Sequence, residues 1–225
     1  MVPSALLPYR SVSRVSVPGL GVCVVQIALA TTILTGPTRV GGILLPHYGL
    51  AVLCLPDIIN RLASVSLSPA HRLWIAGGIA LHPIGALYEY YDTVWWFDHV
   101  AHAASASLLA AGLYACLLTV RRSRREDVAS RPDIGLGGHL AVFALVMTGG
   151  VSWEVFEAYT PALVVYGPTD TLLDLVFDVV GWALVAPVAH RVVGNVPVGL
   201  LRSLGRTGAE QVERSRSVGR SGPES

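Results

Sequence analysis

Six long apolar runs, separated by short polar stretches, dominate the hydrophobicity pattern of this chain. They cover approximately residues 19–35, 41–59, 73–88, 99–120, 139–159 and 172–193. Each run is close to the roughly 20 residues that a helix needs to cross a hydrocarbon core of about 30 Å. The pattern therefore predicts an all-α, polytopic membrane protein with about six transmembrane helices.

Both ends of the chain lack this apolar pattern. Residues 1–18 form a short polar lead, and residues 194–225 are rich in Arg, Ser and Gly. We therefore predict three parts: a cytoplasmic N-terminal lead at 1–18, one transmembrane domain at 19–193, and a disordered cytoplasmic tail at 194–225. The first apolar run continues well past the small residues at 28–30, which favours a retained span over a cleaved signal peptide.

The composition agrees with a membrane location. Of the 225 residues, 52% are hydrophobic and 14% are charged, whereas about a quarter of the residues of a soluble domain are charged. The net charge of +1 gives no reason to expect a nucleic-acid partner, so the expected partner is the lipid bilayer. Cys23, Cys54 and Cys116 lie in apolar segments without metal-ligand spacing, which indicates free thiols.

The positions of the arginines predict the orientation. They gather in the N-terminal lead, in the second and fourth loops and in the tail, whereas the other loops contain only Arg39. Because cytoplasmic loops retain basic residues, we predict a multi-pass protein of the cell membrane with both termini in the cytoplasm. The first, third and fifth loops then face outward.

This orientation brings many ionisable residues to one side of the membrane. Eight of the fifteen acids fall at predicted outer helix ends: Glu89, Asp92, Asp98, Glu154, Glu157, Asp170, Asp174 and Asp178. The last three recur every four residues, so they share one helix face, as do Asp98 and His102.

Burial of a carboxylate near the centre of a span costs about 2.5–3.5 kcal/mol. Glu154, Asp174 and Asp178 therefore need protons, water or a cation, and the histidines available as bases are His47, His82, His99 and His102. Histidine and carboxylate side chains from adjacent helices suit zinc, manganese or iron. The sequence thus predicts a divalent-metal site at the outer ends of the last three spans.

Simpler interpretations exist for several of these residues. Asp98 and Asp170 also fit helix N-caps, Glu89, Asp92 and Glu157 also fit hydrated interfacial charges, and His99 fits a side chain that points to water. The neighbouring aromatic residues fit an outer interfacial belt. They are Tyr88, Tyr90, Tyr91, Trp95, Trp96, Trp153 and Tyr159.

Three motifs carry a family resemblance over about residues 88–190. They are Asp98-x-x-x-His102, Glu154-x-x-Glu157, and Asp170-Thr171-x-x-Asp174 followed by Gly181. In this order they resemble the YjdF-like family of multi-pass prokaryotic inner-membrane proteins of unknown function, and more distantly the VanZ-like proteins. The resemblance implies a shared membrane fold with a functional acidic and histidine cluster, but no reaction. Asp178 departs from the Asn that is usual in VanZ-like proteins, and Ala103–Ala111 is poorer in aromatic residues than the corresponding family helix.

Two functional hypotheses of different classes follow. The first is a metal-dependent hydrolase of a lipid-linked or envelope substrate, in which His102, Glu154, Asp174 and Asp178 bind the metal. In this hypothesis Asp98 orients His102, and Glu157 is the general base for a bound water. The second is a proton- or cation-coupled transporter whose carboxylates titrate as ions pass. A non-catalytic envelope scaffold is a further alternative.

Overall fold

The structure is a computed structural model that describes residues 17–35, 44–62, 67–123, 133–159 and 167–194. These residues are helical and contain no strand, which confirms the all-α prediction. The predicted tail beyond Gly194 and most of the predicted N-terminal lead lie outside the described residues. The elements are α1 (Val17–Thr35), α2 (Leu44–Leu62), α3 (Pro69–Leu87), α4 (Tyr90–Thr93), α5 (Phe97–Ser123), α6 (Gly135–Ala158), α7 (Pro168–Val185), a 3-10 turn (Ala186–Val188) and α8 (Ala189–Val193).

Every predicted apolar run coincides with one long helix or, for the last run, with α7, the 3-10 turn and α8 together. By length and composition, three described segments could each cross a membrane: Phe97–Ser123, Gly135–Ala158 and Pro168–Val193. In α1 the apolar part, Gly21–Thr35, is shorter. Six spans and cytoplasmic termini therefore stay predictions.

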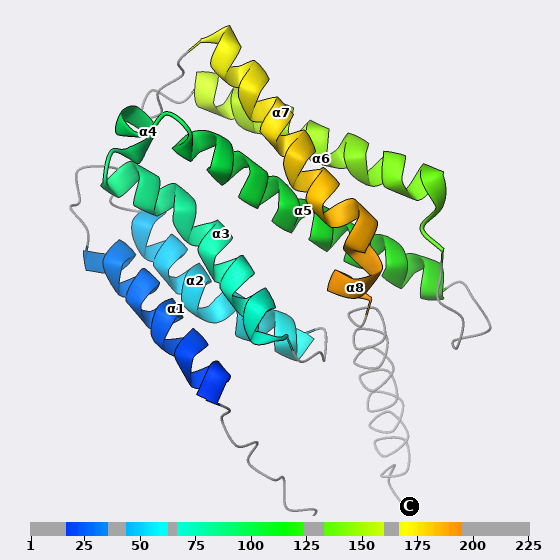
Figure 1. Cartoon of the computed structure of the whole chain (residues 1–225), viewed down its shortest axis with the longest axis horizontal. Helices are drawn as coiled ribbons and strands as arrows, with labels where there is room; N and C mark the ends of the chain where they lie inside the picture. Colours follow the sequence, from blue (N-terminus) through cyan, green and yellow to red (C-terminus); the bar gives the residue numbers. More distant parts are fainter. Residues whose placement is uncertain (1–16, 36–43, 63–66, 124–132, 160–166, 195–225) are drawn as a thin grey trace, which may run out of the picture.

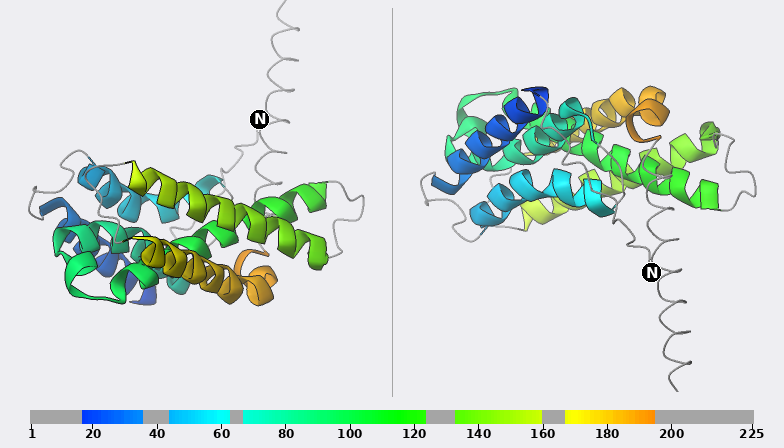
Figure 2. Two further views of the ribbon diagram at one scale, coloured as in Figure 1. Left: turned by 90° about the horizontal axis from the view of Figure 1, so that it is seen from above. Right: turned by 90° about the horizontal axis from the view of Figure 1, so that it is seen from below.

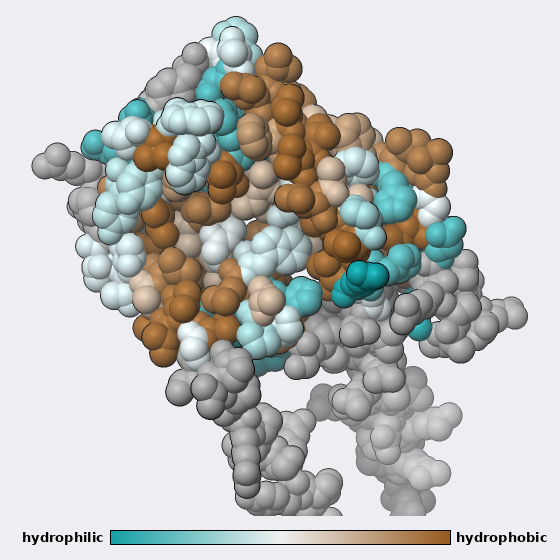
Figure 3. Space-filling model, in the orientation of Figure 1, coloured by the Kyte–Doolittle hydropathy of each residue, from teal (hydrophilic) through white to brown (hydrophobic). Residues whose placement is uncertain are grey.

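The helices form two groups that meet along α5 (Figures 1 and 2). Helices α1, α2 and α3 enclose one apolar cluster, which includes Ile33, Val52 and Ala80. Helices α5 to α8 enclose a second, centred on Tyr114 and Leu118. Apolar side chains also cover the outer surface along α7 (Figure 3), as expected for a surface in contact with lipid.

Close contact between α5 and α7 depends on Gly181. A Cβ atom at this position would collide with the backbone oxygen of Ala103 and with Ala106 on α5. Small residues allow helix backbones to approach closely in a membrane. The two helices run in the same direction (Figure 1), so residues near the start of α5 face residues near the start of α7.

The structure corrects the predicted helix caps. Helix α7 begins at Pro168, and its N-cap is Gly167, whose φ of 110° suits glycine. Asp170 therefore lies in the first turn, and Asp98 likewise lies in the first turn of α5. A negative charge is still favoured there by the helix dipole, but neither acid occupies the N-cap that the sequence predicts.

Candidate functional site

His102 is at the centre of the candidate site. Its ring is buried on α5, and its Nδ1 atom lies 3.3 Å from Oδ1 of Asp178 on α7. Its Nε2 atom faces three further carboxylates: it lies 3.7 Å from Asp98, 3.8 Å from Glu154 and 4.0 Å from Asp174. We call these five residues, which come from α5, α6 and α7, the His102 cluster.

A second histidine supports the cluster from one side. Nδ1 of His99 lies 3.2 Å from Oδ1 of Asp174, the same oxygen that faces His102. The His99 ring stacks on Phe177, with centroids 4.8 Å apart and planes within 8°. His99 is only 8% exposed, so the interpretation of this side chain as solvent-facing is wrong.

The two pairs, His99 with Asp174 and His102 with Asp178, follow from the helix geometry. The histidines are three residues apart on α5 and the acids are four residues apart on α7, so each set lies on one helix face. Because α5 and α7 run in the same direction, the two faces meet in register. Gly181 holds these helices close enough for the side chains to touch.

The cluster has more hydrogen-bond acceptors than donors, and its carboxylates outnumber its histidines. It contains four carboxylates, and even a fully protonated His99 and His102 would neutralise only two of them. Oε1 of Glu154 and Oδ2 of Asp178 are buried without a hydrogen-bond partner among the residues that the structure describes. In a low-dielectric interior such oxygens need a proton, water or a cation.

The geometry is compatible with one metal ion. Ligand atoms of Asp98, His102 and Asp174 all lie within 4.8 Å of one another. Metal bonds to histidine nitrogen and carboxylate oxygen are roughly 2.0–2.2 Å long, so one ion can reach two atoms up to about 4.4 Å apart. All three distances from Nε2 of His102 to the facing carboxylates are shorter than this limit.

The structure thus brings together the four predicted ligands and Asp98. Glu157, the predicted base, is half-buried on α6 one turn beyond Glu154. His47 is exposed on α2. The sequence did not predict that His99 contacts the site. Its position three residues before His102 was the available signal, because it places both rings on one face of α5.

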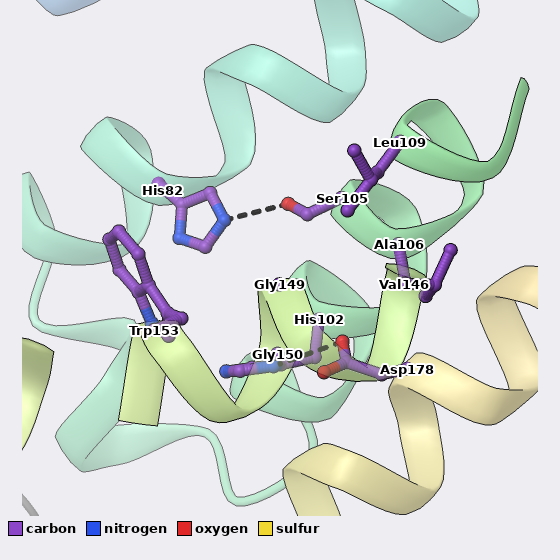
Figure 4. A pocket seen from close by; sticks show the side chains of 10 residues that line it. All are labelled: His82, His102, Ser105, Ala106, Leu109, Val146, Gly149, Gly150, Trp153 and Asp178. Atoms are coloured by element: carbon purple, nitrogen blue, oxygen red, sulfur yellow. Dashed lines mark hydrogen bonds and ion pairs between the residues drawn. The ribbon is translucent and has the colours of Figure 1, made fainter. Parts of the chain in front are cut away.

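A cavity of about 280 Å³ adjoins the cluster, and its wall includes His102 and Asp178 (Figure 4). In its wall His82 is fixed by two hydrogen bonds, one between Nδ1 and the hydroxyl of Tyr91 and one between Nε2 and Oγ of Ser105, each 2.8 Å long. Trp153 also lines the cavity. Tyr91 and Trp153, which are both expected in an outer belt, therefore have specific inward contacts.

We expect His99→Phe to weaken metal binding about 10- to 100-fold, the usual effect of losing a group that orients a metal ligand. Phenylalanine keeps the stacking on Phe177 but cannot hydrogen-bond to Asp174. The matched variant His99→Asn places an amide nitrogen near the position of Nδ1 and should keep most of the affinity. Titration of the metal-stripped protein with Mn²⁺ or Zn²⁺ measures both; equal affinity of the Phe variant and the wild type would show that His99 does not act through Asp174.

Comparison with known proteins supplies a family. A Thermotoga maritima protein described as "Uncharacterized protein" is 24% identical over 142 residues, which cover 60% of this chain and 70% of that protein. No solved structure matches the chain. The description of the Thermotoga protein names neither YjdF nor VanZ, so the resemblance to those two families stays a prediction. The model of the family described as "Predicted membrane protein (DUF2238)" matches residues 20–195, which include the whole His102 cluster, and the chain therefore belongs to this family of membrane proteins.

Proposed function

We propose that the His102 cluster binds one divalent metal ion and that the protein is a metal-dependent membrane hydrolase. One observation carries the proposal: a single histidine nitrogen faces carboxylate oxygens from three different helices at 3.7–4.0 Å. Such convergence of histidine and carboxylates inside a helical bundle is typical of metal centres.

The ring nitrogens of His102 indicate the role of each acid. An ionised carboxylate only accepts hydrogen bonds, so Nδ1 carries the hydrogen shared with Asp178. In a neutral ring the lone pair of Nε2 then points at three carboxylates, an arrangement that is repulsive unless the ring takes up a second proton or a metal cation lies between them. A metal ion also supplies a second positive charge among these acids. We therefore assign Asp98, His102, Glu154 and Asp174 as metal ligands.

This assignment exchanges the roles of two acids relative to the sequence hypothesis. Asp178 becomes the residue that orients His102 through Nδ1, and Asp98 becomes a ligand. Metal-binding histidines commonly donate their second ring nitrogen to a carboxylate in this way, which fixes the tautomer. His99 has the corresponding role for Asp174.

The ligand set favours zinc, manganese or iron, because it combines three oxygen donors with one imidazole nitrogen. The side chain of Asp98 is 21% exposed, whereas that of His102 is 5% exposed, so water reaches the cluster past Asp98. A bound metal would polarise this water. We propose Glu157, one turn beyond Glu154 on α6, as the base that accepts its proton.

We further propose that the substrate is lipid-linked and that the cluster lies at the outer membrane surface. This location rests on the six predicted spans and on the arginine distribution, which place the start of α5 and α7 outside. Hydrolysis joins the oxygen of water to the acyl or phosphoryl group of the substrate, and the leaving oxygen takes a proton.

A transport function is less well supported than hydrolysis. In the described parts of α5, α6, α7 and α8, no carboxylate lies between Asp178 and the opposite end of the bundle. The polar pairs found there are Trp74 with Ser107 and Tyr114 with His139. A transported cation would lack carboxylate partners over that part of its path.

Incubation in water labelled with ¹⁸O tests the proposed hydrolysis directly. The purified protein, stripped of metal and reloaded with Mn²⁺ or Zn²⁺, is incubated with bacterial inner-membrane lipids in H₂¹⁸O. Mass spectrometry should reveal ¹⁸O-labelled lipid products that require the metal and that disappear with Glu154→Gln, which keeps the side-chain size. Absence of label with fully loaded protein would contradict hydrolysis while leaving the metal site intact.

A further inference from the structure

The cavity beside the His102 cluster extends along two neighbouring helices. On α5 it is lined at His102, Ser105, Ala106 and Leu109, and α6 contributes residues at the same spacing. The spacing i, i+3, i+4, i+7 is one face of a helix. Because seven residues span about 10 Å of helix, the cavity runs inward from the cluster for about that distance.

The wall of the cavity changes from polar to apolar along this length. Along α5 the lining runs from His102 to Leu109, and along α6 it runs from Trp153 to Val146 (Figure 4). Leu109 and Val146 therefore line the end away from the cluster. A lipid in one leaflet has the same polarity, with its head group at the membrane surface and its chains towards the centre. The cavity thus matches an amphiphile aligned with the bilayer.

One buried atom in the cavity wall lacks a partner. Asp178 is 4% exposed, its Oδ1 atom faces His102, and its Oδ2 atom has no hydrogen-bond partner within the described part of the chain. A Cβ atom at Gly150 would collide with this Oδ2, so the glycine leaves the room that the oxygen occupies beside α6. A ligand that donates a hydrogen bond would satisfy it.

At Leu109 the wall of the cavity is also part of the exposed outer surface of the bundle. Leu109 is 42% exposed although it lines the cavity. It lies on α5, against which both α3 and α6 pack. A molecule in the bilayer can therefore reach the cavity past Leu109 without crossing the water-exposed end of the bundle.

From these observations we propose that the cavity binds one membrane lipid whose head group donates a hydrogen bond to Oδ2 of Asp178 and whose chain lies against Leu109 and Val146. A hydroxyl or an ammonium group is a suitable donor. The proposal rests on the proposed function, since it assigns the substrate class of the same site: a lipid that enters sideways with its head group beside the metal ligands.

Native mass spectrometry of the full-length protein in detergent tests this assignment with three synthetic dioleoyl lipids. Phosphatidylglycerol offers hydroxyl donors, phosphatidylethanolamine offers an ammonium donor, and phosphatidylcholine offers neither. We expect the first two to bind at least about tenfold more tightly than the third, because only they can donate a hydrogen bond to the buried carboxylate. Equal binding of all three lipids would overturn the assignment of Asp178.

A variant that fills the deep end tests the position of the chain. A Cβ atom added at Gly149 would lie against Leu109, so the larger side chain of Gly149→Leu would occupy the space of the lipid chain. Lipid retention should fall at least about tenfold. The matched control Gly137→Leu lies on the same helix, exposed and with nothing within 4 Å of an added Cβ; it should retain lipid normally. Unchanged retention by a folded Gly149→Leu protein would contradict the proposed chain position.

The metal content of the same samples separates the two proposals. Metal-loaded protein without selective lipid binding would overturn the lipid pocket and leave the metal site standing. Selective lipid binding by protein that takes up no metal would support the pocket and contradict the hydrolase.

Discussion

Replacement of His102 by alanine is expected to abolish metal binding and to destabilise the fold by roughly 3–5 kcal/mol, the usual cost of leaving a buried charge without its partner. The variant removes the only nitrogen among the proposed metal ligands and the partner of Asp178 at once. It leaves four carboxylates together in the bundle. Metal content and resistance to unfolding by sodium dodecyl sulfate measure the two effects.

His190→Ala is the matched control, because His190 is exposed on α8. It should change neither metal content nor stability. Wild-type metal content in the His102→Ala protein would remove His102 from the ligand set. Unchanged stability would show that the carboxylates are neutralised by other means, such as shared protons.

Gly181→Leu is expected to separate α5 from α7 and to destabilise the protein by about 3 kcal/mol, at the upper end of the usual cost of overpacking. The obstacle is the backbone oxygen of Ala103, which cannot rotate away as a side chain can. Because the two helices carry the histidine and acid pairs, metal content should fall together with thermal stability.

The control for Gly181 is Gly112→Leu on α5, where the glycine is exposed and an added Cβ has nothing within 4 Å. This variant should be neutral or slightly stabilising, because leucine is a better helix former than glycine. If Gly181→Leu were as stable as Gly112→Leu, the close approach of α5 and α7 would not be what positions the site.

Much of the helical framework could be predicted from the sequence. The apolar runs located the six long helices of the described segments, because a long stretch of apolar residues is a strong signal for a helix of membrane length. The spacing of Asp174 and Asp178 also indicated that both side chains share one face of α7. The arginine distribution suggested that the acids of α5, α6 and α7 lie at similar depth, and the structure does bring Asp98, Glu154 and Asp174 to one histidine.

The relative rotation of the helices could not be predicted, and it decides the role of each side chain. Sequence spacing places Asp98 and His102 on one face of α5, but it does not reveal which ring nitrogen meets Asp178. Burial of His99 depends on Phe177 and Asp174 from another helix. The predicted N-cap at Asp170 was wrong for a local reason. Helix α7 begins earlier, at Pro168, which is preceded by Gly167 as the N-cap.

The central claim is that a divalent metal ion binds in the His102 cluster and offsets part of its negative charge, and elemental analysis of the purified wild-type protein tests it most directly. Prepared without chelators, the folded protein should contain about one zinc, manganese or iron ion per chain, as a single site with four protein ligands requires. A folded protein that contains none of these metals, and that binds none when they are added, would contradict the account.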